Sequence, residues 1–211
     1  MSLEVKICGI NSIEAAQAAK MADFVGFIFY PRSPRYISGK KAQELSTYLP
    51  KSIKKVGIFV EEEDDKISEI LSLVKLDYLQ FHGEESPDRI DQVRKKFKLP
   101  VIKAIKVEKE KDLEAAYPYY QCANMLLFDT KPPKGLKNLL PGGNAISFDW
   151  SILAKKGFPI SWVLSGGLRA ENIKKAVAIS GAKIIDVSSG VEGNLGKKSS
   201  KLIRKFLEIS K

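Results

Sequence analysis

SWVLSGGLRAENIKKAVAISGAKIIDVSSG, residues 161–190, is the stretch that decides the fold of this chain. Its two ends, SWVLSGGL (161–168) and KIIDVSSG (183–190), are apolar runs of strand length. Between them, NIKKAVAIS follows Glu171 and stops at Gly181, as helices that end on a glycine do. Two buried strands joined through a helix form a parallel pair, so the stretch predicts one β-α-β unit.

The same kind of strand recurs along the rest of the chain. Six more candidates precede the unit: VKICGI (5–10), DFVGFIF (23–29), KKVGIFV (54–60), DYLQFHG (77–83), VIKAIKV (101–107) and NMLLFDT (124–130). Their nearly continuous apolar character and their β-branched and aromatic residues are typical of parallel strands buried on both faces. The sequence therefore predicts eight such strands.

Helical segments separate these strands. The candidates are IEAAQAAKM after Ser12, GKKAQELSTYL after Ser38, KISEILSLV after Asp64 and Asp65, SPDRIDQVRKKF with Pro87 in its first turn, DLEAAYPYY from Asp112, WSILAKKG after Asp149, NIKKAVAIS, and residues 197–210. Strict alternation of strand and helix favours an α/β fold, and eight repeats in 211 residues favour closure into a TIM barrel, (β/α)8. We expect a single domain over residues 1–211. An open doubly wound sheet is the alternative, although no GxGxxG follows the first strand.

Composition limits the compartment and the partners. No run of about 18 apolar residues could span a membrane, and MSLEVKICGI lacks the features of a signal peptide. We therefore expect a cytoplasmic protein with no membrane partner. The two cysteines, Cys8 and Cys122, are interpreted as reduced thiols rather than as a disulfide framework.

The formal net charge is +10, which favours the capture of anions. The lysines are scattered in pairs such as Lys40-Lys41 and Lys54-Lys55, without a basic run that carries interleaved aromatics. No nucleic-acid motif occurs either. We expect a small phosphorylated molecule as the partner and no nucleic acid, with the chain acting as a monomer or a homodimer.

Glycine and serine residues end the last two strand candidates. Gly166 and Gly167 follow the seventh strand, and Ser188, Ser189 and Gly190 follow the eighth. These two loops form the recurrent phosphate site of (β/α)8 barrels, where backbone N–H groups approach the anion. A pair of tight turns without a ligand is the alternative interpretation.

Cys8 and Asp129 end the first and the sixth strand candidates, at the rim where active sites of such barrels lie. A thiol and a carboxyl on opposite sides of a bound sugar can move protons at two different atoms. Lys6 lies on the same strand face as Cys8 and could favour its thiolate by lowering the thiol pKa. A core thiol and a turn-forming carboxylate are the alternatives.

Four more polar side chains are expected at this rim: Arg35, Gln80, His82 and Asp186. Arg35 lies in PRSPRYIS, where its guanidinium could bind a carboxylate with both arms, unless it is only a solvent-exposed loop residue. His82 is the single histidine, and neither H-x-x-H nor C-x-x-C spacing occurs, so we expect no metal site.

In this order, VKICGI, GFIFYPRSPRYIS, VGIFV, LQFHGEE, LLFDT, FDW, LSGGLRAENI and IDVSSGVE resemble the phosphoribosylanthranilate isomerase family of tryptophan biosynthesis. The resemblance extends from Val5 to Gly196. It implies an Amadori rearrangement with Asp129 as general acid, Cys8 as general base and no metal or organic cofactor. It also places Arg35 near the anthranilate moiety. The resemblance assigns the phosphate cradle to backbone groups of Gly166, Gly167, Ser188, Ser189 and Gly190.

Two segments depart from the family pattern. A GGTG-like segment usually precedes FDW, whereas here Gly142-Gly143-Asn144-Ala145 stands there, in a loop expected to cover the substrate. EGNLGKKSS also lacks the acidic residue common after the lysine. Neither departure touches the acid–base pair.

Other functions remain open at this point. A different sugar-phosphate isomerase or epimerase would keep the phosphate loops without needing Cys8 opposite Asp129. A catalytically inactive barrel kept as a binding protein would need neither residue.

Overall fold

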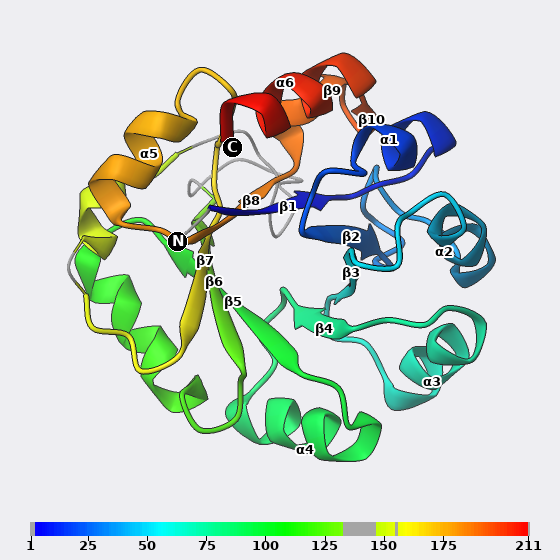
Figure 1. Cartoon of the computed structure of the whole chain (residues 1–211). Coiled ribbons are helices and arrows are strands. Elements are labelled where there is room, and N and C mark those ends of the chain that lie inside the picture. The colour runs from blue at the N-terminus through cyan, green and yellow to red at the C-terminus, as the bar shows by residue number, and fades with distance from the viewer. Residues whose placement is uncertain (1–2, 133–146, 155, 211) are drawn as a thin grey trace.

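The computed structural model describes residues 3–132, 147–154 and 156–210, and eight parallel strands close into a barrel at its centre (Figure 1). The strands are β1 (Glu4–Cys8), β2 (Phe24–Ile28), β3 (Lys54–Phe59), β4 (Tyr78–Phe81), β5 (Val101–Val107), β6 (Met125–Thr130), β7 (Ser161–Leu164) and β8 (Ile184–Val187). Strand β1 pairs with β2 on one side and with β8 on the other, which closes the ring. The predicted (β/α)8 fold is confirmed, and the open sheet is excluded.

Alternation along each strand separates two apolar layers. Residues such as Ile58 and Leu127 pack inside the barrel, whereas their neighbours Phe59 and Phe128 pack outward in the core shared with the helices. Cys8 belongs to the inner cluster, and Asp129 has the same parity as Leu127. The alternation therefore directs these predicted site residues to the inside of the barrel.

Six α-helices are described in the outer ring (Figure 1). They are α1 (Ile13–Ala18), α2 (Gly39–Ser46), α3 (Asp64–Leu73), α4 (Pro87–Phe97), α5 (Ile173–Ser180) and α6 (Ser200–Ser210). Ser12, Ser38 and Ser86 cap three of them, because each hydroxyl accepts an N–H of the first turn. In the described part of the chain, no helix is long and apolar enough to cross a membrane.

A helix is present in each of the eight connections for which the sequence predicts one. In the described part of the chain, the helices after β5 and β6 are 3₁₀ helices, η1 (Glu110–Tyr119) and η2 (Trp150–Leu153), whereas the others are α-helices. Pro118 lies inside η1, where its missing N–H and its ring disfavour an α-helix. The stretch after β8 also differs, because η3 (Ser189–Val191) and an antiparallel hairpin, β9 (Glu192–Asn194) and β10 (Lys197–Lys198), precede α6.

A buried ion pair fastens the loops after β3 and β4. Lys103 Nζ lies 3.1 Å from Glu85 Oε2 and donates to the Gly83 carbonyl at 2.7 Å. Both charged side chains are 3% exposed. The other carboxylate oxygen accepts the N–H groups of Glu61 and Gly83. One carboxylate therefore ties strand β5 to two neighbouring loops.

Lys103→Met is expected to lower the free energy of unfolding by roughly 3 kcal/mol, because it leaves Glu85 buried without its cation. Backbone N–H groups still bind Glu85 in this variant, so the loss should lie at the lower end of the range for a broken buried ion pair. The free energy of unfolding is measured by denaturant unfolding. Lys66→Met is the matched control, because the Lys66–Glu69 pair is 42% and 57% exposed and such exposed pairs contribute little to stability. Equal losses in the two variants would contradict the prediction.

Candidate active site

A pocket opens at the carboxyl ends of the barrel strands. The predicted site residues that line it are Cys8, Arg35, His82, Asp129, Gly166, Gly167, Asp186, Ser188 and Ser189. The space between its walls, counted out to the open mouth, is about 810 Å³. The barrel thus gathers residues from both ends of the sequence around one pocket.

A buried ion pair lies beside Cys8. Lys6 Nζ contacts Asp186 Oδ1 at 2.8 Å, and the two side chains are 1% and 4% exposed. Ser165 Oγ donates to the second oxygen of Asp186 at 3.2 Å. The carboxylate of Asp186 is therefore held by two protein groups, although it also lines the pocket.

Burial raises the pKa of the Cys8 thiol. The ammonium groups of Lys6 and Lys198 favour the thiolate but do not offset burial. Lys6 does act to lower the pKa of the thiol, but the expectation of a net lowering was wrong because burial outweighs this effect. A thiolate formed here is a stronger base than one with an ordinary pKa.

Asp129 stands at the end of β6, where its carboxyl has two neighbours. Its Oδ1 accepts the N–H of Thr130 at 2.8 Å, and its Oδ2 lies 3.2 Å from His82 Nε2. This distance is short, but the contact falls outside hydrogen-bond geometry. On the other side of the ring, Gln80 Nε2 lies 3.1 Å from His82 Nδ1.

Gln80 differs from its predicted place. It is fully buried behind His82 and is not among the described residues that line the pocket. Its amide orients the imidazole, which in turn approaches Asp129. Sequence periodicity placed these three side chains at the rim but gave no sign that they form a chain of contacts.

The predicted phosphate loops approach each other closely. Gly166 has φ +89°, and a Cβ there would lie 2.3 Å from Thr130 Oγ1. A Cβ on Gly190 would lie 1.9 Å from the carbonyl oxygen of Leu168. Gly190 therefore lets the loops after β7 and β8 pack together and, unlike its neighbours Ser188 and Ser189, is not among the described lining residues.

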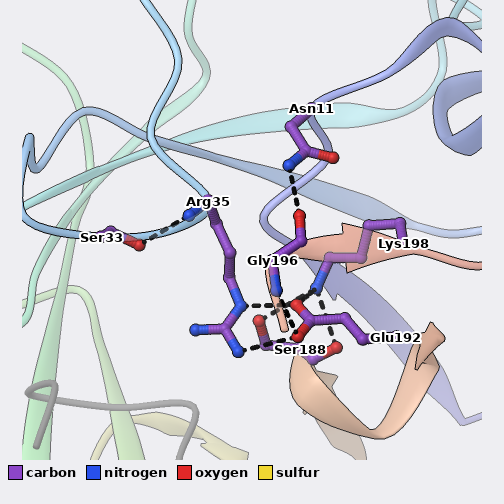
Figure 2. A network of polar contacts seen from close by, with 7 residues as sticks. All are labelled: Asn11, Ser33, Arg35, Ser188, Glu192, Gly196 and Lys198. Carbon is purple, nitrogen blue, oxygen red and sulfur yellow. Dashed lines mark hydrogen bonds and ion pairs between the residues drawn. The ribbon is translucent and has the colours of Figure 1, made fainter. Parts of the chain in front are cut away.

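Arg35 is 2% exposed, so its interpretation as a solvent-exposed loop residue is wrong. Its Nε lies 2.5 Å from Glu192 Oε1, and its Nη2 lies 3.0 Å from Oε2 (Figure 2). Glu192 in turn contacts Lys198 Nζ at 2.8 Å. The guanidinium at the pocket wall is thus held by a carboxylate of the β9–β10 hairpin.

No group of three or more His, Cys, Asp or Glu side chains that could hold a metal ion occurs among the residues that the structure describes. Asn144 and Ala145, which depart from the family pattern, lie outside the described residues. In the other departing segment, Ser199 Oγ accepts the N–H of Leu202 at 3.4 Å. A serine therefore provides a side-chain cap at the start of α6 without an acidic residue.

The sequence profile of N-(5'phosphoribosyl)anthranilate (PRA) isomerase matches residues 5–209. The chain belongs to the phosphoribosylanthranilate isomerase family. An N-(5'-phosphoribosyl)anthranilate isomerase of Paramagnetospirillum magneticum is 47% identical over 213 residues, which cover 100% of this chain and 98% of that relative. The predicted family is confirmed, and with it the assignment of the protein as an isomerase of tryptophan biosynthesis.

Solved structures agree with the family assignment. The phosphoribosylanthranilate isomerase of Thermotoga maritima has a TM-score of 0.86 and 39% identity, covering 99% of this chain and 98% of its own. Another isomerase structure, a complex with reduced 1-(o-carboxyphenylamino)-1-deoxyribulose 5-phosphate, has a TM-score of 0.81 and 37% identity, with 99% and 98% coverage. The likeness therefore extends over the whole barrel.

Sequence reasoning missed the partners that hold the site residues of this isomerase. Glu192 stands inside IDVSSGVE, and Lys198 follows shortly after, but neither was singled out. An acidic residue just after the predicted phosphate loop could have pointed to Glu192, since a carboxylate that is buried there needs a cationic partner. The partner itself, Arg35, is 157 residues away, and no spacing rule connects the two.

Proposed function

We propose that this chain converts N-(5-phosphoribosyl)anthranilate into 1-(o-carboxyphenylamino)-1-deoxyribulose 5-phosphate by a cofactor-free Amadori rearrangement. The observation that carries the proposal is that Cys8 and Asp129, from strands β1 and β6, line one pocket together with the loops after β7 and β8. An acid and a base on different strands can serve two atoms of one sugar. The isomerase complex with a reduced 5-phosphate compound supports a ligand of this class.

The first step is the opening of the ribose ring. The carboxyl of Asp129 donates a proton to the ring oxygen while the bond between that oxygen and C1′ breaks. The lone pair of the aniline nitrogen forms the C1′=N bond, which gives a protonated Schiff base. The N–H of Thr130 holds the other carboxyl oxygen of Asp129, and the imidazole of His82 lies 3.2 Å from the carboxyl.

The second step is proton removal from C2′. The Cys8 thiolate takes the proton, the C2′–H electron pair forms the C1′=C2′ bond, and the C1′=N pair returns to nitrogen. The product is an enolamine, which becomes the ketone when the C2′ hydroxyl loses its proton and C1′ gains one. The positive Schiff base beside Cys8 favours the thiolate, and so opposes the effect of burial on the thiol pKa.

The two ends of the substrate carry negative charge. The loops around Gly167 and Ser189 offer backbone N–H groups to the phosphate, and Arg35 offers its guanidinium to the anthranilate carboxylate. These contacts would place C1′ and C2′ between Cys8 and Asp129. The aniline nitrogen serves as the electron sink, so the proposed chemistry needs no cofactor.

A fluorescence assay tests the proposed function. The purified protein is mixed with freshly made phosphoribosylanthranilate, and its fluorescence is followed against a sample without protein. We expect loss of the fluorescence with formation of the ketose product, identified by mass and by its reaction as a ketone. Failure of the wild-type protein to consume this substrate would refute the proposal.

The pH profile of kcat/KM should fall at high pH, because the proposed reaction needs a deprotonated Cys8 and a proton on Asp129 in the same free enzyme. Rising pH supplies more thiolate only up to the pKa of the thiol, and above that value it only removes the proton that the general acid must donate. Burial raises the pKa of this thiol, so the fall should begin above the ordinary thiol value of about 8.5. The quantity to follow is kcat/KM, because it reports groups of the free enzyme. A profile that already falls below this value would contradict a Cys8 base with a raised pKa.

Arg35→Lys should lower kcat/KM by about 10–150-fold, which corresponds to roughly 1.5–3 kcal/mol for a hydrogen bond to a charged group. Lysine keeps the charge but cannot bind a carboxylate with two parallel N–H groups. Arg32→Lys is the matched control, since Arg32 is exposed in the same loop. An equal effect of both substitutions would show that the loop, not the guanidinium of Arg35, matters.

A further inference from the structure

We propose that Glu192 and Lys198 on the β9–β10 hairpin are positioning residues that link the two anion-binding ends of the pocket. Glu192 orients Arg35 toward the carboxylate end of the substrate, and Lys198 fixes Ser188 at the phosphate end. The inference rests on the proposed function, and it assigns the hairpin after β8 a part in substrate binding.

Glu192 holds the plane of the Arg35 guanidinium. Its side chain is 4% exposed, and its two oxygens take Nε and Nη2 of Arg35 in a two-armed pair. The backbone N–H of Gly196 donates to Oε2 at 3.1 Å, so the carboxylate is itself fixed by the turn of its own hairpin. Such a pair restricts both the position and the rotation of the guanidinium.

Lys198 holds the start of the phosphate loop. Its side chain is fully buried, and Nζ has three acceptors: the Ser188 carbonyl at 2.8 Å, the Ser188 hydroxyl at 3.2 Å and Glu192 Oε1 at 2.8 Å. An ammonium has three N–H donors, so these contacts match its capacity. In Figure 2, dashed lines join Glu192 to both Arg35 and Lys198, and join Lys198 to Ser188.

The hairpin is also fastened to the neighbouring loops of the rim, because β8 lies beside β1 in the closed barrel. Asn11 Nδ2 donates to the carbonyl of Gly196 at 2.7 Å (Figure 2). Gly196 has φ +75°, and a Cβ there would lie 2.5 Å from the carbonyl oxygen of Pro34, next to Arg35. The hairpin therefore contacts the loops after β1 and β2 as well as its own loop after β8.

The charges of this cluster suit a monoanionic group. Arg35 and Lys198 carry one positive charge each and Glu192 one negative charge, which leaves one positive charge at the pocket wall. Burial favours protonated Glu192, but Arg35 and Lys198 hold its pKa below the ordinary value. Buried ionic clusters are often no more stable than apolar replacements, so stability alone does not account for this one.

Two variants separate charge from orientation. Lys198→Met leaves Arg35 and Glu192 as a neutral pair, keeps Arg35 oriented and frees Ser188. Glu192→Gln combined with Lys198→Met restores the net charge of the wild-type cluster but removes the carboxylate that orients Arg35. Lys197→Met is the matched control, because it removes one exposed positive charge from the same strand.

Titration with inorganic phosphate and with the reduced 5-phosphate product, together with KM and kcat, tests the inference. Lys198→Met should weaken the binding of inorganic phosphate about tenfold or more and raise KM, while kcat changes less. The double variant should bind the reduced product more weakly than Lys198→Met does, because only this ligand carries the carboxylate for Arg35. Thermal unfolding establishes that each variant is folded.

Folded variants that bind both probes as the wild type does, or a Lys197→Met variant that binds as weakly as Lys198→Met, would overturn the inference. If the wild-type protein binds the reduced product and the variants bind it equally well, the positioning role of the hairpin is refuted but the proposed function is not. Wild-type protein that does not bind the reduced product counts against the proposed function, and the inference falls with it.

Discussion

Cys8→Ser is expected to lower kcat by about 10²–10⁴-fold, the contribution of one general base. The hydroxyl keeps the size of the thiol but is a far weaker acid, so it supplies almost no base near neutral pH. Burial makes the substitution more severe, because it disfavours an anion at this position. The measurement is steady-state turnover of phosphoribosylanthranilate, with the pH profile recorded in parallel.

Two observations separate a catalytic effect of Cys8→Ser from a general effect of changing a buried thiol. The space around Cys8 is tight, since a Cβ on Gly26 would lie 3.1 Å from its Sγ, but serine is no larger than cysteine and should fit. Cys122→Ser is the matched control, because Cys122 is also a buried free thiol but does not line the pocket. Nearly full activity of Cys8→Ser would exclude thiolate catalysis.

The sequence predicted the parts of the fold that local patterns determine. Strand β5 spans Val101–Val107, the range that its apolar run predicted, and the caps at Ser12 and Ser38 follow from short side chains that accept N–H groups of the first turn. Period-two alternation also directed Cys8 and Asp129 to one rim. These features need only neighbours in the chain.

The features that the sequence left open or misjudged depend on contacts across the barrel. Local pattern could not decide between Arg35 in the pocket wall and Arg35 in solvent, because its partner Glu192 is brought to it only by closure of the ring. The pKa of Cys8 was expected to fall because Lys6 could be seen in the sequence, whereas the burial that raises the pKa could not. Similarly, local pattern directed Gln80 to the rim, but its role behind His82 depends on packing.

Asp129→Asn is expected to lower kcat by about 10²–10⁴-fold, the contribution of one general acid. Asparagine keeps the shape of the side chain, and its carbonyl can still accept the N–H of Thr130, so the end of β6 should stay in place. It cannot donate a carboxyl proton to the ring oxygen. Ring opening, and therefore every later step, should become slow.

The pocket has a second carboxyl group, that of Asp186, so the experiment can decide which of the two is the general acid. Asp186 is engaged by Lys6 and by Ser165, whereas the Oδ2 of Asp129 faces an imidazole with no hydrogen bond formed between them. Asp186→Asn should therefore reduce kcat much less than Asp129→Asn, and both variants should still bind inorganic phosphate, because the proposed cradle consists of backbone groups and includes neither carboxyl. If Asp186→Asn had the larger effect on kcat while Asp129→Asn remained active, the general acid would be Asp186, and the proton that opens the ring would come from strand β8 beside Cys8 rather than from across the barrel.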